Sequence, residues 1–196
     1  MKTYTVFAGV NGAGKSTIYR ALNKDFGIRI NVDEVVKEQF GHDWKSTSAQ
    51  LKAGRLVVKQ IQSCLSGNES FNQETTLTGH TIVTNIKKAK TNGFRVSLYY
   101  VGLASAELSI ERVASRVKSG GHGIPEEDLR RRYVGSFENL RRVFSLCDEI
   151  RVFDNSAKEQ FNAHSPLFFV KDGNILVYDE NCPQYLKNVL NEYINR

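Results

Sequence analysis

A glycine-rich segment near the amino terminus has the residue types that bind phosphate. It reads GVNGAGKST and matches the GxxxxGK[ST] pattern of a P-loop, with an apolar strand before it and a helix after it. The glycines let successive backbone N–H groups point at one anion, and the positive end of the helix adds to that field. Lys15 can reach the β- and γ-phosphates, and the Ser16 hydroxyl can coordinate Mg²⁺. ATP and Mg²⁺ are therefore the expected cofactors. The residues expected at the triphosphate are Gly9, Val10, Asn11, Gly12, Ala13, Gly14, Lys15, Ser16 and Thr17.

Acidic side chains follow the next two predicted strands. Asp33 follows a strand over Ile28–Val32, and Glu74 ends a short strand over Ser70–Gln73. Ligands bind beyond the carboxyl ends of the strands in open α/β sheets, so both residues share one edge with the P-loop. A phosphoryl acceptor needs a base near its hydroxyl group, and Asp33 is placed for that role. The alternative role for Asp33 is to cap the helix that follows.

A polar cluster, Glu74-Thr75-Thr76, stands at the end of the third strand. Its side chains suit binding of a hydroxylated substrate, with Glu74 and Thr76 as the expected contacts. The alternative is capping of the next helix, for which Thr78 is better placed. No strand ends in the apolar run followed by Asp that usually supplies a second Mg²⁺ contact in P-loop enzymes. Asp33 and Glu74 both remain candidates for that contact, through water.

A basic helix followed by glycines indicates a lid over residues 112–125. Arg112 and Arg116 are four residues apart and share a helix face, and Gly120-Gly121-His122-Gly123 follows. Such a segment can bring positive charge over the transferred phosphoryl group and exclude water. We predict catalytic roles for both arginines and a phosphate or substrate contact for His122. The alternative is an exposed helix face on which they pair with solvent and Glu111.

A second group of arginines, Arg130 to Arg132, begins the next helix. An acidic residue stands four positions before each of them, which predicts helix ion pairs without any ligand. Arg132 is the one that we expect to face the nucleotide. Asp154, at the end of the last parallel strand, either borders the adenine pocket or belongs to a simple turn.

Composition and charge narrow the class of protein. The 196-residue chain carries 27 basic and 21 acidic side chains, a net charge of +6, which suits polyanionic ligands such as ATP or a nucleotide sugar as well as nucleic acid. Its three cysteines lie far apart and show no metal-ligand or disulfide spacing, which indicates reduced thiols. No stretch approaches the roughly 18 apolar residues that span a bilayer, and no signal sequence is evident. We expect a cytoplasmic protein without membrane contact.

Strand and helix signals alternate along the chain, which is typical of an α/β domain with a mostly parallel sheet. We expect one P-loop domain over residues 1–196, a three-layer sandwich of nucleotide-kinase-like fold with a C-terminal hairpin and helix over residues 165–196. The five strands predicted for the parallel sheet are Tyr4–Ala8, Ile28–Val32, Ser70–Gln73, Phe94–Leu103 and Glu149–Phe153. The hairpin strands are Leu167–Val170 and Ile175–Tyr178, and the final helix is Gln184–Ile194.

These motifs together resemble the zeta-toxin family of P-loop kinases, especially its small stand-alone bacterial members. The resemblance rests on GVNGAGKST, INVDEV, ETTLTG, RVASRVKSGGHGIPEEDLRRRY and VFDNS, in this order, over residues 3–156. It implies transfer of the ATP γ-phosphate to a hydroxyl of UDP-N-acetylglucosamine, a reaction that obstructs cell-wall synthesis. It also implies an antitoxin protein as a partner.

The resemblance carries specific roles to matching residues. Lys15 matches the P-loop lysine, and Asp33 matches the catalytic base. Glu74 and Thr76 match the acid and the threonine that contact the sugar nucleotide. Arg112 and Arg116 fall where the family places phosphate-stabilising arginines. This chain has His122 about where the toxins carry a second lid arginine, and its substrate region is shorter, so the acceptor can differ.

The sequence therefore predicts an ATP-dependent small-molecule kinase with a nucleotide sugar as the expected acceptor. A kinase of another nucleoside, sugar nucleotide or nucleic-acid end is one alternative. A nucleotide-dependent switch or a nucleic-acid-associated ATPase is another, and the absence of an NKxD motif argues against a GTPase. We expect no nucleic-acid partner.

Overall fold

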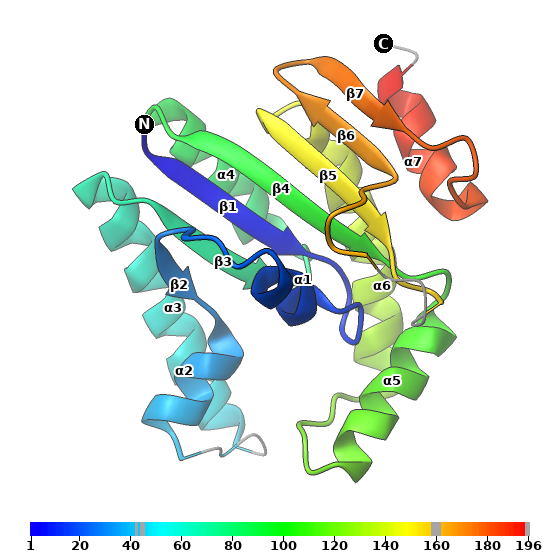
Figure 1. Cartoon of the computed structure of the whole chain (residues 1–196). Coiled ribbons are helices and arrows are strands. Elements are labelled where there is room, and N and C mark those ends of the chain that lie inside the picture. The colour runs from blue at the N-terminus through cyan, green and yellow to red at the C-terminus, as the bar shows by residue number, and fades with distance from the viewer. Residues whose placement is uncertain (42, 44–45, 158–161, 195–196) are drawn as a thin grey trace.

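A seven-stranded sheet forms the centre of the molecule (Figure 1). The structure is a computed structural model that describes residues 1–41, 43, 46–157 and 162–194. The strand order is β2-β3-β1-β4-β5-β6-β7. The first five of these strands are parallel, and β6 and β7 continue the sheet as an antiparallel hairpin. The strands are β1 Thr3–Ala8, β2 Ile28–Ile30, β3 Phe71–Thr75, β4 Arg95–Gly102, β5 Glu149–Asp154, β6 Phe168–Lys171 and β7 Asn174–Tyr178. The expected fold class, a mostly parallel α/β sheet with a C-terminal hairpin and helix, is confirmed.

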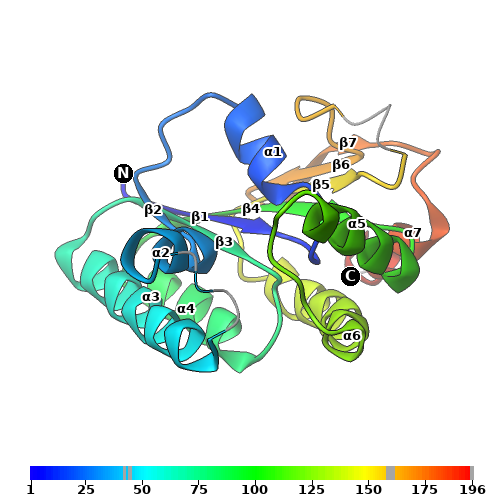
Figure 2. The same ribbon diagram turned by 90° about the horizontal axis from the view of Figure 1, so that it is seen from below.

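Helices cover both faces of the sheet (Figure 2). They are α1 Lys15–Ala21, α2 Val32–Gln39, α3 Thr47–Gly67, α4 His80–Thr91, α5 Ala106–Lys118, α6 Glu126–Phe144 and α7 Gln184–Ile194. Helix α1 lies on one face, and α3, α4 and α6 lie on the other. Helices α2 and α5 lie on opposite sides of the P-loop, beyond the carboxyl ends of the strands (Figure 1).

Alternation along the central strands divides the apolar core into two layers. In β1, Tyr4 and Val6 pack into the larger core under α3, α4 and α6, whereas Phe7 packs into the smaller core under α1. In β4, Leu98 and Tyr99 separate in the same way. Successive side chains of a strand point to opposite faces, so buried strands of this kind hold both layers of helices. The sheet therefore gives the loops at its carboxyl edge a rigid base.

Two strand boundaries differ from the predicted ones, and both matter for the site. Strand β2 ends at Ile30, because Asn31 caps α2: its Oδ1 accepts a hydrogen bond from the Asp33 backbone N–H at 2.9 Å. Asp33 thus lies in the first turn of α2 and does not cap it. Strand β3 continues to Thr75, so Glu74 is part of the sheet, in register with Phe7 of β1.

Capping of α4 also differs from the expectation. Thr78 does not cap the helix; Gly79 precedes its first turn, without a side-chain cap. The Thr78 hydroxyl instead lies 2.8 Å from the hydroxyl of Thr76. The predicted end of this helix at Asn92-Gly93 agrees with the structure.

Candidate functional site

The segment from Gly9 to Gly14 forms a tight loop between β1 and α1, and Lys15, Ser16 and Thr17 form the first turn of α1. Gly14 has φ 98° at the start of α1, and a Cβ atom there would lie 2.6 Å from Nδ2 of Asn155. Gly9 has φ 140°, and a Cβ atom there would lie 2.3 Å from the carbonyl oxygen of Val101. Both positions require glycine, because an L side chain would be strained and would also collide with its neighbours.

Lys15 is buried inside this loop, and its Nζ donates a hydrogen bond to the Val10 carbonyl oxygen at 3.1 Å. Burial lowers the pKa of Lys15, and the nearby carboxylates of Glu74 and Asp33 act in the opposite direction. Lys15 is therefore a buried cation at the point where a P-loop lysine meets phosphate.

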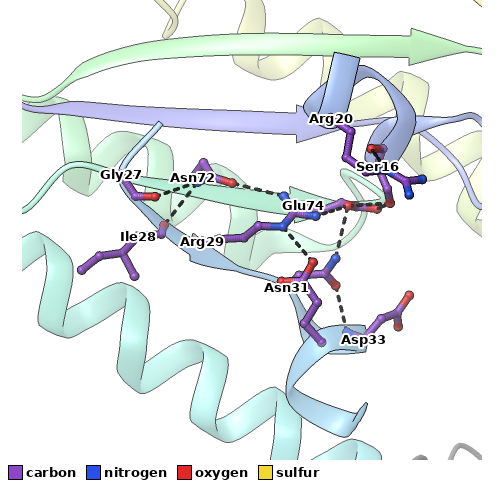
Figure 3. A network of polar contacts seen from close by, with 10 residues as sticks. Ser16, Arg20, Gly27, Ile28, Arg29, Asn31, Asp33, Asn72 and Glu74 are labelled. Atoms are coloured by element: carbon purple, nitrogen blue, oxygen red, sulfur yellow. Dashed lines mark hydrogen bonds and ion pairs between the residues drawn. The ribbon is translucent and has the colours of Figure 1, made fainter. Parts of the chain in front are cut away.

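Glu74 lies directly against the P-loop serine (Figure 3). The Ser16 hydroxyl lies 3.0 and 2.9 Å from the two carboxylate oxygens of Glu74. Arg29 and Asn31 also donate to Oε2 of Glu74, at 2.8 and 3.2 Å. Of the two acids that the sequence left open, Glu74 is thus the one that contacts Ser16. A hydroxyl and a carboxylate are the oxygen ligands that Mg²⁺ prefers, so this pair fits a Mg²⁺ ion.

A cavity of about 290 Å³ opens beside the loop, between α2 and the segment that follows α5. Seven of the residues that the sequence singled out line it, namely Asn11, Lys15, Asp33, Glu74, Thr76, His122 and Arg132. Its lining residues are Asn11, Lys15, Asn31, Val32, Asp33, Val36, Gln50, Gln73, Glu74, Thr75, Thr76, Thr78, His122, Ile124 and Arg132. Asp33 lies on the α2 side and His122 on the side of the predicted lid. The four predicted substrate-binding residues thus share one polar cavity.

Positive charge gathers on the lid side of this cavity. Arg116 is half-buried, and its Nη2 donates to the His122 carbonyl oxygen at 2.7 Å. Burial lowers the pKa of His122; Asp33 acts in the opposite direction, whereas Arg116 and Arg132 lower it further. Nη1 of Arg132 donates to Oδ1 of Asn11 in the P-loop at 3.2 Å. Arg132 therefore faces the P-loop; that it faces the nucleotide stays a prediction.

The two arginines before Arg132 pair with acids, but not with the expected ones. Arg130 binds Glu107 of α5, and Arg131 binds Asp128 at 2.6 Å, three residues earlier. The expectation of ion pairs four residues apart is wrong here, because α5 packs near α6 and offers Arg130 a different acid.

Arg112 and Asp154 do not line this cavity. Arg112 is buried, with its Nη1 3.4 Å from the Gly12 carbonyl oxygen and its Nη2 3.0 Å from that of Ser156. Asp154 accepts hydrogen bonds from the hydroxyl groups of Tyr185 and Ser156, at 2.6 and 2.5 Å. Arg112 thus contacts the P-loop at Gly12 and ties it to Ser156.

Sequence reasoning did not predict the contacts by which three side chains hold the site. Asn155 donates to the Ala13 carbonyl oxygen at 2.8 Å, and the Ser109 hydroxyl donates to that of Asn11 at 2.7 Å. Arg29 binds Glu74, as described above. Asn155 and Ser109 contact the loop from over 90 residues away in sequence, and no local pattern marks such contacts. Arg29 occupies the strand before Asp33, where a charged residue between two isoleucines was a usable signal.

The parallel sheet, the loop that follows its middle strand β1 and the cavity beyond its carboxyl edge define a P-loop protein of the nucleotide-kinase-like class. A family model described as zeta toxin matches residues 2–182. The chain therefore belongs to the zeta toxin family, and the resemblance drawn from the motifs is confirmed.

Three comparisons show the extent of the likeness. An uncharacterized protein from Haemophilus influenzae is 35% identical over 127 residues, which cover 65% of this chain and 89% of that protein. A chain of the AvrRxo1-ORF1:-ORF2 crystal structure with ATP has a TM-score of 0.70 at 19% identity, over 95% of this chain and 63% of that chain. A chain from the PezAT chromosomal toxin–antitoxin system of the human pathogen Streptococcus pneumoniae has a TM-score of 0.58 at 17% identity, over 100% and 85%. The two solved structures share the fold.

Among the described residues, no helix has the length and apolar character that crossing a membrane requires.

Proposed function

We propose that the protein is an ATP-dependent kinase that transfers the γ-phosphate to a hydroxyl group of a small polar acceptor. The observation that carries this proposal is the shared cavity: Lys15 of the P-loop and the carboxylate of Asp33 line the same hollow. A kinase needs this juxtaposition, because phosphoryl transfer depends on holding the acceptor in line with the γ-phosphate and near a base. Membership of the zeta toxin family supports the same reading.

Each side chain at the cavity has a role in this proposal. The loop N–H groups and Lys15 bind the β- and γ-phosphates. Asp33 accepts the proton of the acceptor hydroxyl as the new phosphate bond forms. Ser16 and Glu74 would hold Mg²⁺, which when bound neutralises charge on the phosphates. ATP is also present in the AvrRxo1-ORF1:-ORF2 structure that shares this fold.

The lid side supplies positive charge at the moment of transfer. Arg132 and His122 line the cavity together with Lys15, and Arg116 donates to the His122 carbonyl oxygen. The electrostatic effect of both arginines reaches Lys15. We propose that Arg116 and Arg132 stabilise the negative charge on the phosphoryl group during its transfer. The catalytic role expected for Arg112 stays a prediction; here we assign it indirect support of the loop through Gly12.

Polar side chains of the cavity indicate the kind of acceptor. Thr75, Thr76 and Thr78 contribute hydroxyl groups to the cavity lining, and Gln50 and Gln73 contribute amides. Such a lining suits a molecule with several hydroxyl and amide groups. A nucleotide sugar such as UDP-N-acetylglucosamine meets that description and is the acceptor that the family resemblance implies.

A screen of acceptors by mass spectrometry tests the proposal. The protein is incubated with ATP, Mg²⁺ and a panel of nucleotide sugars, nucleosides and oligonucleotides. We expect one nucleotide sugar to gain the mass of one phosphate, and we expect Asp33→Asn to suppress that product. Transfer to oligonucleotide ends alone would replace the nucleotide-sugar acceptor, and no transfer to any class would overturn the kinase proposal.

A protein partner is a separate proposal. PezAT is a toxin–antitoxin system with the same fold in one of its chains, so we propose that an antitoxin protein binds this chain. Co-purification of the chain with the product of an adjacent gene, followed by loss of toxicity on co-expression, is the expected result. A chain that is harmless when expressed alone would contradict it. A cytoplasmic location stays a prediction.

A further inference from the structure

Arg29 of β2 connects the acid of the site to the rest of the sheet (Figure 3). Its Nη2 binds Oε2 of Glu74 at 2.8 Å, and its Nε binds Oε1 of Glu34 at 2.8 Å. The third nitrogen, Nη1, donates to Oδ1 of Asn72 at 3.3 Å. Every nitrogen of the guanidinium group thus has an acceptor, which fixes the plane of the group.

The side chains on which Arg29 rests are themselves fixed. Asn72 is fully buried in β3, and its Nδ2 donates to the carbonyl oxygens of Gly27 and Ile28, at 3.2 and 3.4 Å. The guanidinium carbon also lies 3.8 Å from the ring centroid of Tyr19, on helix α1. Because α1 also carries Ser16, Arg29 touches both the strand that bears Glu74 and the helix that bears its hydroxyl partner.

The two carboxylate oxygens of Glu74 have different hydrogen-bond partners. Oε2 accepts from Arg29, Asn31 and Ser16, whereas Oε1 accepts from Ser16 alone among the described hydrogen bonds. Only 11% of the Glu74 side chain is exposed, so few water molecules reach it.

We propose that Arg29 is a positioning residue for divalent-cation binding at the P-loop: by binding Oε2, it holds the Glu74 carboxylate against Ser16 and leaves Oε1 to the Ser16 side. This inference rests on the proposed function in one respect, namely that nucleotide binds with Mg²⁺. Lysine cannot replace Arg29, because an ammonium group has no planar fork to bind two carboxylates and stack on a ring at once. Charge alone is therefore not sufficient at this position.

The test is the degree to which Mg²⁺ tightens nucleotide binding, measured by calorimetry with a non-hydrolysable ATP analogue in EDTA and in excess MgCl₂. The quantity of interest is the dissociation constant in EDTA divided by the dissociation constant in MgCl₂, which is large when Mg²⁺ tightens binding. Residues that orient metal ligands typically change metal affinity by about 10- to 100-fold, so we expect Arg29→Lys to lower this ratio about 10-fold. Affinity in EDTA should stay near the wild-type value, because Lys15 and the loop amides are untouched.

Arg95→Lys is the matched control. Arg95 also joins two carboxylates, Glu149 at 3.2 Å and Asp172 at 2.8 Å, and its side chain is 19% exposed against 16% for Arg29. Arg95 is the first residue of β4. It therefore lies at the amino-terminal ends of the parallel strands, whereas the P-loop lies at their carboxyl ends. We expect the same cost in thermal stability from both variants and a changed Mg²⁺ ratio from Arg29→Lys alone.

Two further variants keep the test decisive if Arg29→Lys folds poorly. Tyr19→Leu leaves every charge in place and removes the ring under the guanidinium group, and we expect the ratio to fall about three-fold. In a Glu74→Gln background, Arg29→Lys should have little further effect, because Arg29 acts through the carboxylate. Three results would each overturn the inference. They are additive losses in the Glu74→Gln, Arg29→Lys double variant, an unchanged ratio in Arg29→Lys, and an equal loss of the ratio in Arg95→Lys. A failure to transfer phosphate would overturn the proposed function and leave this result intact.

Discussion

The Ser16 hydroxyl of the P-loop meets both carboxylate oxygens of Glu74, at 3.0 and 2.9 Å. Glu74 belongs to a buried parallel strand in register with β1, so the sheet itself sets this distance. The strand therefore delivers an acid to the P-loop serine without the apolar run and Asp that usually mark such an acid in sequence.

We expect Glu74→Gln to make the protein depend on much higher Mg²⁺ concentrations. Glutamine keeps the shape of the side chain but loses the charge that a divalent cation requires, and losses of about 10- to 100-fold are typical for such partners. Titration of MgCl₂ against the initial rate of transfer measures the change. A variant with the wild-type Mg²⁺ requirement would show that Glu74 has no part in metal binding.

Asp33→Asn should remove most of the transfer rate. A positioned general base contributes about 10²- to 10⁴-fold, and the rate constant kcat should fall by that amount while KM for ATP changes little. Stability should stay unchanged, because Asp33 is exposed and Asn31 caps the helix. Glu38→Gln, also exposed on α2, is the control and should retain full activity. Full turnover by Asp33→Asn would remove the assignment of the base.

Lys15→Met should abolish nucleotide binding and yet stabilise the ligand-free protein at neutral pH. Burial lowers the pKa of Lys15 in the folded state below its ordinary value of about 10.4. At pH values between the two pKa values, the unfolded chain binds more protons than the native protein, so stability rises with pH in that window. Below both pKa values, the buried charge of Lys15 lowers the free energy of unfolding by its full amount.

The advantage of Lys15→Met should therefore shrink as the pH rises from the lowered pKa of the folded state to the ordinary value of about 10.4 in the unfolded chain. Thermal unfolding without ligand at neutral and at alkaline pH measures this difference. A change of about 1 kcal/mol corresponds to about 2–4 °C in Tm for a domain of this size. A lower Tm for the variant at neutral pH would contradict the account of Lys15 as a destabilising cation.

Gly14→Ala should impair both stability and nucleotide binding. Its φ of 98° and the 2.6 Å approach of a Cβ atom to Asn155 combine strain with a collision. Gly173→Ala is the control, since φ is 80° there and a Cβ atom would have no neighbour within 4 Å. We expect the control to lose about 1–2 kcal/mol from backbone strain alone and to bind nucleotide normally. Equal behaviour of the two variants would show that the contact with Asn155 is unimportant.

The fold was largely predictable from the sequence, because its strands are apolar runs separated by glycine, asparagine and proline signals. The P-loop was predictable for a different reason: its function demands particular residues at fixed spacing, as at Lys15 and Ser16. The position of Asp33 also followed from the order of strands. The end of β2 did not, because a single capping asparagine, Asn31, starts α2 at Val32 and so ends the strand at Ile30.

The supports of the site were beyond prediction from local patterns. Asn155 and Arg112 reach the P-loop from segments over 90 residues away, and their partners are backbone carbonyl groups, which leave no trace in sequence. The arrangement of Arg29, Asn72 and Glu74 depends on the register of β2 with β3. Register follows from packing across the whole sheet, so such a network is visible only once the strands are paired.

A crystal structure with Mg²⁺ and a non-hydrolysable ATP analogue tests the central claim most directly. The account predicts the triphosphate inside the loop Gly9–Thr17, with its γ-phosphate at the cavity and the Asp33 carboxylate turned toward it across the space for an acceptor hydroxyl. A loop without nucleotide, or an Asp33 carboxylate directed away from the γ-phosphate into bulk solvent, would contradict it.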